Sequence, residues 1–315
     1  MEVLLQISGG LALLALGGEG VIRGAVGIAR EFGLSELLIG LTLVGFGTSA
    51  PELLTSINAA LSGSPGIAIG NVVGSNIGNI LLVLAVVAII RPMPVNPAAI
   101  WRDGFVMIAA SLMFVGVAVY FGELDRLTGL VLIALVALYI LVVWLLERGD
   151  GPSAQIHKGE AHPHAPPPAL WISALLALGG LGLLVFGSDL LVDGAIALAR
   201  VAGMSETAIG LTIVAVGTSL PEFVATLAAA LKGKNDVAFG NIVGSNIYNI
   251  FGILGATALI QPIAIPPEVT IIDWGAMVGA ATLLLLFATT GKRVARLEGV
   301  CLLALYAGYV AHLLA

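Results

Sequence analysis

Two long stretches of the chain contain no charged residue, Leu53 to Ile90 and Val237 to Pro267. About 20 apolar residues are enough to cross the hydrocarbon core of a bilayer, so each stretch is long enough for parts of two membrane spans. Charged residues make up 10% of the 315-residue chain and hydrophobic residues 59%, whereas soluble domains have about 25% and about 45–50%. So few charges cannot cover a water-exposed surface, which excludes an ordinary soluble enzyme, a disordered chain and a basic nucleic-acid-binding protein.

Hydropathy and the Gly- and Pro-rich breaks predict an all-α polytopic membrane protein with ten transmembrane helices. The spans are expected near residues 3–30, 36–62, 67–90, 99–121, 127–146, 170–200, 206–231, 237–260, 269–290 and 295–314. A stretch rich in Pro, Gly and His between the fifth and sixth spans is typical of a polar linker. We therefore expect five spans in residues 1–148, a linker at 149–169, and five spans in residues 170–315.

The two groups of five spans are copies of each other at an offset of 170 residues. The segment GLTLVGFGTSAPE (Gly40–Glu52) recurs as GLTIVAVGTSLPE (Gly210–Glu222), with nine of thirteen residues identical. The segment GNVVGSNIGNI (Gly70–Ile80) recurs as GNIVGSNIYNI (Gly240–Ile250), with nine of eleven identical. Because each copy has an odd number of spans, the second enters the membrane upside down. Two inverted five-helix repeats with Gly- and Pro-interrupted segments indicate a transporter whose site lies near the midplane.

The distribution of Lys and Arg provides an independent test of this topology. With ten spans, two cationic residues, Arg126 and Arg200, fall on one side of the membrane and eleven on the other. The eleven are Arg23, Arg30, Arg91, Arg102, Arg148, Lys158, Lys232, Lys234, Lys292, Arg293 and Arg296. Cytoplasmic loops carry the excess of Lys and Arg. We therefore expect a multi-pass protein of the cell (inner) membrane, with both termini extracytoplasmic and the linker at 149–169 cytoplasmic.

One glutamate lies in the middle of the second span and another in the middle of the seventh, Glu52 and Glu222. Ionisable groups at this depth are costly and mark functional sites. No Lys or Arg is expected at a comparable depth in either half, so a bound cation is the expected partner. Pro51 and Pro221 precede the glutamates and predict a kink in each helix. Carboxylates and freed backbone carbonyls are hard oxygen ligands, which Ca²⁺ and Na⁺ prefer.

Further polar side chains surround the glutamates at helical spacing. Hydroxyl residues flank each glutamate on one helix face at four-residue steps. The two faces are Thr48, Glu52 and Ser56, and Thr218, Glu222 and Thr226. The third and eighth spans carry polar stripes with the same step, Asn71, Ser75 and Asn79, and Asn241, Ser245 and Asn249. A single such residue is typical of hydrogen bonding between helices, but duplication of the whole pattern favours a cation site.

The doubled motifs resemble the α-repeats of the cation/calcium exchanger superfamily, in particular its prokaryotic sodium/calcium exchanger branch. The residues that carry the resemblance are GTSAPE with GNVVGSNIGNI, and GTSLPE with GNIVGSNIYNI. The resemblance implies antiport of Ca²⁺ against Na⁺ by alternating access, with calcium held between Glu52 and Glu222. It also implies that the glycine-rich first and sixth spans slide across a fixed core. The further ligands that it implies are the Thr48, Thr218, Ser49, Ser219, Ser75 and Ser245 oxygens and the Gly45 and Ala215 carbonyls.

Two positions depart from the pattern of the superfamily. Members often have Asp where this chain has Asn249, and some also where it has Asn79. With both neutral, the expected site holds two carboxylates, which disfavours the potassium-dependent branch. The proton/calcium branch resembles GNxxE rather than GTSxPE around its glutamates, so H⁺/Ca²⁺ exchange is also disfavoured. Both remain alternatives.

Two further function classes can be weighed against antiport. A cation channel would use similar oxygens, but it would conduct without a counter-ion. An enzyme would need a base beside Ser49 or Ser219, but no histidine accompanies either serine in the repeated motifs, and His312 lies near the C-terminus. The linker residues His157, His162 and His164 are typical of a solvated linker, although metal binding or pH sensing there stays open. We expect no cofactor, no nucleic acid and no obligate protein partner, only Ca²⁺, Na⁺ and the lipid bilayer.

Overall fold

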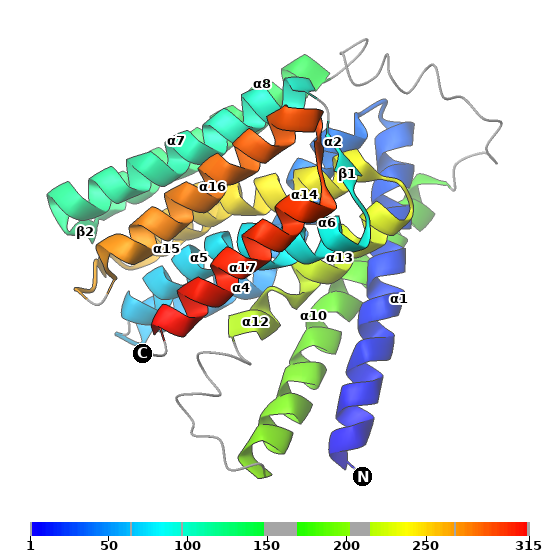
Figure 1. The fold of residues 1–315 in the computed structure, drawn as a ribbon, viewed down its shortest axis with the longest axis horizontal. Helices are drawn as coiled ribbons and strands as arrows, with labels where there is room; N and C mark the ends of the chain where they lie inside the picture. The colour runs from blue at the N-terminus through cyan, green and yellow to red at the C-terminus, as the bar shows by residue number, and fades with distance from the viewer. Residues whose placement is uncertain are drawn as a thin grey trace.

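The computed structural model describes residues 2–63, 65–95, 97–147, 169–201, 215–267 and 269–313. Most of the predicted linker and its three histidines therefore lie outside the described residues. The described part is helical apart from four strands of two residues each. Figure 1 shows a molecule built almost entirely of helices, which agrees with an all-α membrane protein.

The helices of the first half occupy its five predicted spans. They are α1 (Glu2–Glu31), then α2 (Glu36–Ile39), η1 (Gly40–Val44), α3 (Gly45–Thr48) and α4 (Ala50–Leu61) in the second span, α5 (Pro65–Gly78), η2 (Asn79–Leu84) and α6 (Ala85–Ile90) in the third, α7 (Pro97–Phe121), and α8 (Arg126–Glu147). The elements η1 and η2 are π-helical turns. The second and third spans are therefore both interrupted, whereas the other three are continuous.

The second half repeats this order. Its helices are α10 (Leu170–Val201), then α12 (Ala215–Thr218) and α13 (Leu220–Leu231) in the seventh span, α14 (Asn235–Tyr248), η4 (Asn249–Leu254) and α15 (Gly255–Ile260) in the eighth, α16 (Ile271–Gly291), and α17 (Arg296–Leu313). The part of the seventh span before Ala215 lies outside the described residues. Each of the ten predicted spans thus corresponds to helix.

Length and composition alone identify up to eight of these ten spans. Within the described ranges, seven helices are long and apolar enough to cross a membrane, and the bent pair Leu37–Thr48 and Ala50–Leu61 makes an eighth. The seventh and tenth spans are represented by α13, which is shorter, and by α17. The third and eighth spans are the most enclosed, with 72% and 83% of their apolar windows buried, against 28% for α8. They form the core of the bundle, while helices such as α8 face lipid.

Two small antiparallel sheets join the connectors of the two halves. Strand β1 (Met93–Pro94) pairs with β4 (Arg293–Val294), and β2 (Glu123–Leu124) pairs with β3 (Ile263–Ala264). At the offset of 170 residues, β3 is the counterpart of β1 and β4 is the counterpart of β2. The two sheets are therefore equivalent, and each pairs one strand from each half.

These pairings require an inverted repeat. Strand β1 follows the third span and β4 follows the ninth, which is the fourth of its own half. In a direct repeat these two connectors would lie on opposite faces of the membrane and could not pair, whereas in an inverted repeat they lie on the same face. The predicted fold, ten transmembrane helices as two inverted repeats, is confirmed.

The connectors also share an unusual backbone turn. Gly122 ends α7 with φ 68° and its counterpart Lys292 ends α16 with φ 53°. Both backbone carbonyls accept a hydrogen bond at 2.9 Å, from the amides of Ile265 and Val95 respectively. A left-handed φ costs a side-chain-bearing residue energy that glycine does not pay. The second repeat has the same turn with a lysine at the position of the glycine.

The first and sixth spans pack against each other as a pair. Figure 1 shows α1 and α10 side by side, extending away from the remaining helices. Glycines allow this contact, because a Cβ added at Gly17 would lie 2.9 Å from the carbonyl oxygen of Gly180. One ion pair joins α1 to the core, from Glu19 to Lys232 at the end of α13, at 2.6 Å.

Candidate functional site

Each glutamate begins a helix immediately after a break. The helix segments on either side of Ser49 are bent by 45°, and Pro51 lies in the first turn of α4 with Glu52. Ser219 separates α12 from α13 in the same way, with Pro221 and Glu222 in the first turn. A proline fits a first turn because its missing N–H has no intrahelical partner there. The predicted helix interruptions are present, and the carboxylates sit where backbone N–H groups favour negative charge.

The two carboxylates are buried without a cationic partner among the described residues. Glu52 and Glu222 are each 1% exposed. Both carboxylate oxygens of Glu52 and one of Glu222 lack any hydrogen-bond donor. The remaining oxygen, Oε1 of Glu222, accepts a hydrogen bond from Ser49 Oγ at 2.8 Å. Buried carboxylates with unsatisfied oxygens are costly unless a cation neutralises them.

An asparagine joins each glutamate-bearing helix to the next span, half-buried in the first repeat and fully buried in the second. Asn71 Nδ2 donates to the carbonyl oxygen of Glu52 at 3.0 Å and to Ser56 Oγ at 2.9 Å. Asn241 Nδ2 donates to the carbonyl oxygen of Glu222 at 3.2 Å and to Thr226 Oγ1 at 2.8 Å. The first residue of each predicted polar stripe therefore contacts the glutamate-bearing helix.

Hydrogen bonds also cross between the halves at the helix break. Thr48 Oγ1 donates to Asn241 Oδ1 at 3.2 Å and lies 3.3 Å from the carbonyl oxygen of Gly45. That carbonyl also accepts from Ser245 Oγ at 3.1 Å and from the amide of Ser49 at 3.3 Å. Residues from both repeats thus meet at one place, as the inverted topology requires.

Asn79 and Asn249 each begin a π-helical turn, η2 and η4. Both are 1% exposed, and the Oδ1 atom of each lacks a hydrogen-bond donor. Asn249 Nδ2 donates to Asn76 Oδ1 at 3.0 Å, which links the third and eighth spans. π-Helical turns are rare and frequent at functional sites. These two amide oxygens are available to a ligand, and the sequence pattern did not predict the turns that present them.

The remaining predicted site residues have few described side-chain contacts. Ser75 and Ser219 are each 6% exposed, and neither makes a side-chain hydrogen bond within the described part of the chain. Thr218 is half-buried at the end of α12. Ala215 is the first residue of α12, and its side-chain surroundings lie outside the described residues.

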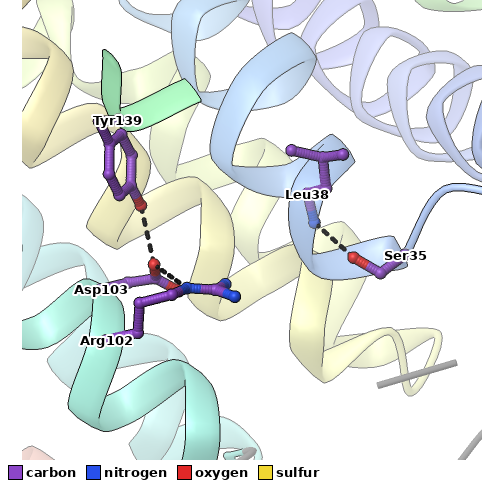
Figure 2. Close-up of polar contacts among 5 residues, drawn as sticks. All are labelled: Ser35, Leu38, Arg102, Asp103 and Tyr139. Carbon is purple, nitrogen blue, oxygen red and sulfur yellow. Dashed lines mark hydrogen bonds and ion pairs between the residues drawn. The ribbon is translucent and has the colours of Figure 1, made fainter. Parts of the chain in front are cut away.

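A second pair of buried carboxylates lies apart from the glutamates. Asp103 is fully buried and is held by Arg102 at 2.8 Å and by the hydroxyl of Tyr139 at 3.1 Å, as Figure 2 shows. Its counterpart Asp273 accepts from Tyr309 at 2.7 Å. Each aspartate therefore joins the fourth helix of its repeat to the fifth. Since both are hydrogen-bonded, they fasten helices and do not wait for a cation.

Figure 2 also shows how the second span begins. Ser35 Oγ accepts a hydrogen bond from the backbone amide of Leu38 at 3.1 Å. This is the arrangement by which a serine caps a helix N-terminus. The cap precedes η1, so it defines where the interrupted second span starts.

Comparison with known proteins places this arrangement in context. The model of the family described as sodium/calcium exchanger protein matches residues 3–145 and 172–315. The chain is 33% identical to the sodium/calcium exchanger MaX1 of Methanosarcina acetivorans, over 96% of this chain and 95% of that protein. It is 36% identical to the inner membrane protein YrbG of Escherichia coli, over 85% and 83% respectively.

A solved structure shows the same fold. The sodium–calcium exchanger NCX_Mj, soaked with zero Na⁺ and Ca²⁺, superposes with a TM-score of 0.84 at 32% sequence identity, covering 99% of each chain. The likeness extends over both halves and therefore includes both glutamate-bearing helices.

Proposed function

The chain belongs to the sodium/calcium exchanger family, a family of cation antiporters, and on that premise we propose that it exchanges Ca²⁺ for Na⁺ across the membrane by alternating access. The protein is a transporter and not an enzyme. The cations bind between Glu52 and Glu222, with Thr48, Thr218, Ser49, Ser219, Ser75, Ser245, Asn79, Asn249 and the carbonyls of Gly45 and Ala215 as the further ligands.

The observation that carries the proposal is the set of unpartnered buried oxygens. Three carboxylate oxygens of Glu52 and Glu222 and the Oδ1 atoms of Asn79 and Asn249 have no donor. Oxygen-only ligand sets suit Ca²⁺ and Na⁺. Two carboxylates balance the charge of one Ca²⁺ or of two Na⁺. Competition for the same oxygens prevents both cargoes from binding together, and this competition is the basis of exchange.

The helix pair α1 and α10 is the element that moves in this proposal. The glycine contacts between Gly17 and Gly180 keep the pair together, while the third and eighth spans form the enclosed core. Sliding of the pair across the core would expose the site to each side in turn. Residues 1–148 and 170–315 supply the two repeats, and residues 149–169 connect them.

The proposed orientation follows from the cationic residues. With eleven of thirteen on one side, that side is cytoplasmic, so the linker lies inside and both termini lie outside. The inner-membrane location of the relative YrbG supports the assignment to the cell membrane. After replacement of Cys301 by Ser, a cysteine introduced at Pro152 should be protected from an impermeant thiol reagent added to intact cells, and one at Ala315 should be labelled. The reverse pattern would refute the orientation.

The function is tested by ion flux in reconstituted vesicles. Sodium, potassium and proton gradients are imposed separately, and Ca²⁺ uptake is measured against each. We expect uptake with an outward Na⁺ gradient and no requirement for K⁺, because Asn249 adds no negative charge to the site. An absolute K⁺ requirement or uptake driven by protons alone would reassign the coupling ion. Uptake that persists without any counter-ion gradient would indicate a channel.

A further inference from the structure

Asn241 has no unused hydrogen-bonding group. It is fully buried, its Nδ2 donates to the carbonyl oxygen of Glu222 and to Thr226 Oγ1, and its Oδ1 accepts from Thr48. A side-chain amide has two N–H donors and one carbonyl acceptor. Both donors are used, and the Oδ1 atom already accepts one hydrogen bond, from Thr48. Asn241 therefore differs from Asn249, whose Oδ1 has no donor.

Asn71 makes the equivalent two hydrogen bonds in the other repeat, and we call each such pair of hydrogen bonds a clamp. Asn71 bonds the carbonyl oxygen of Glu52 and the hydroxyl of Ser56, and both contacts span the same sequence separations as those of Asn241, 19 and 15 residues. In each case the amide grips the first two turns of the helix that carries the glutamate. Because the glutamate side chain extends from that turn, the clamp fixes the backbone position from which the carboxylate reaches into the site.

The clamp of Asn241 also orients a hydroxyl proton. Thr48 has a single hydroxyl proton, and both Asn241 Oδ1 and the carbonyl oxygen of Gly45 lie within hydrogen-bonding distance of its Oγ1. A hydroxyl can ligate a cation only through its lone pairs, so its proton must point to another acceptor. Asn241 is such an acceptor and belongs to the opposite repeat from Thr48.

We propose that Asn71 and Asn241 are positioning residues for cation binding: they touch no cation, fix the helix turns that carry Glu52 and Glu222, and in the case of Asn241 turn the Thr48 proton away from the cation. This inference rests on the proposed function, because it concerns the same site. Removing a group that orients a metal ligand typically lowers affinity about 10–100-fold.

The matched variants are Asn241→Ala and Asn246→Ala. Asn246 lies on the same helix, is 1% exposed, and its Nδ2 donates to the carbonyl oxygen of Ile242 within that helix at 2.7 Å. Both variants lose one buried amide, but only the first loses contact with the glutamate helix. The measurements are the Ca²⁺ concentration that half-saturates thermal stabilisation of the purified protein, and the half-saturating Ca²⁺ concentration and maximal rate of exchange.

We expect Asn241→Ala to raise both half-saturating concentrations about tenfold, and Asn246→Ala to leave them within about twofold of the parent. Equal losses in the two variants, or parent affinity in Asn241→Ala, would overturn the inference. If Asn241→Ala does not fold, Thr226→Val removes one acceptor of the clamp and Thr226→Ser keeps it. Weakened binding in Thr226→Val with near-parent binding in Thr226→Ser supports the clamp, and equal binding in both overturns it.

Thermal stabilisation of the parent protein by each cation distinguishes failure of this inference from failure of the proposed function. A parent stabilised by Na⁺ but not by Ca²⁺ would overturn the calcium assignment alone, and the variants are then compared in Na⁺ with the same expected loss. A parent stabilised by neither cation would overturn both proposals.

Discussion

Glu52 and Glu222 occupy equivalent positions in the two repeats, but the structure holds them differently. Glu222 accepts a hydrogen bond from Ser49 of the opposite repeat, whereas both carboxylate oxygens of Glu52 lack a donor. The repeat therefore duplicates the chemical groups but not their contacts. If the ligand groups of the two repeats formed identical half-sites, both would bind and release cations alike. With unequal half-sites, a cation can leave one half-site before the other.

The largest expected effect comes from neutralising either glutamate. In Glu52→Gln and Glu222→Gln, we expect exchange to fall about a hundredfold or more, since losing one charged partner of a buried ionic site costs about 3 kcal/mol or more.

Without cations the stabilities of the two variants should differ, because Gln at position 52 removes a charge that no hydrogen bond supports. The unfolding temperature of the cation-free protein should rise more in Glu52→Gln. Variants that misfold, with normal exchange by the folded remainder, would make the glutamates structural.

Ser49→Ala and Ser219→Ala address the comparison directly. Removing the Ser49 hydroxyl leaves another buried oxygen of Glu222 without a donor and should cost about 2 kcal/mol in the cation-free state. Ser219 makes no corresponding bond to Glu52, so its replacement should cost clearly less. Unfolding followed by temperature or denaturant measures the difference. Equal costs would show that the half-sites are equivalent in solution.

The turn after the fourth helix of each repeat offers a smaller contrast. Lys292→Gly should stabilise the protein by about 1 kcal/mol, because glycine adopts the left-handed conformation without the strain of a side chain. Gly122→Lys should destabilise it by a similar amount. Thermal unfolding of the two single variants provides the test, and changes of the same sign would exclude backbone strain as the cause.

The smallest effect is expected at the ion pair that joins α1 to the core. Glu19 and Lys232 are 40% and 30% exposed in their side chains, and such pairs contribute about 0.2–1 kcal/mol. The counterparts at the 170-residue offset are Asp189 and Ser62, which cannot form an ion pair. Lys232→Ala should therefore destabilise slightly at low salt and less at high salt, while Ser62→Ala should have no salt-dependent effect. A double-mutant cycle with Glu19→Gln isolates the pair.

The sequence was informative wherever a feature occurs twice at a fixed offset. Charge-free stretches, the odd number of spans and the doubled GTSxPE motif were enough to predict ten helices, the inversion and the interrupted glutamate helices. These depend on composition and spacing, which the sequence displays directly. The strands β1 to β4 were not predicted, because two-residue strands have no periodicity to detect.

The site was predictable in its members but not in its contacts. Spacing placed Asn71 and Asn79 on one stripe as similar oxygen donors, yet one is a clamp and the other has an open oxygen. The distinction depends on which neighbouring helix faces each residue, and helical periodicity contains no such information. Likewise, the Ser49 to Glu222 bond departs from the symmetry of the motif, so no repeat-based argument could find it. The one available signal for Asn241 was its recurrence with Thr226 at the spacing of Asn71 with Ser56.

The strand pairs that link the connectors have a consequence for biosynthesis. Strand β1 ends at Pro94 and its partner β4 begins at Arg293, so about 200 residues must be synthesised before the pair can form. At about 5–20 residues per second, this takes roughly 10–40 s. Strand β2 likewise has no partner until β3, which begins at Ile263, has been synthesised. The membrane insertion machinery, or lipid itself, must therefore protect the incomplete helix bundle and its unpaired strands until the ninth helix and β4 have emerged from the ribosome.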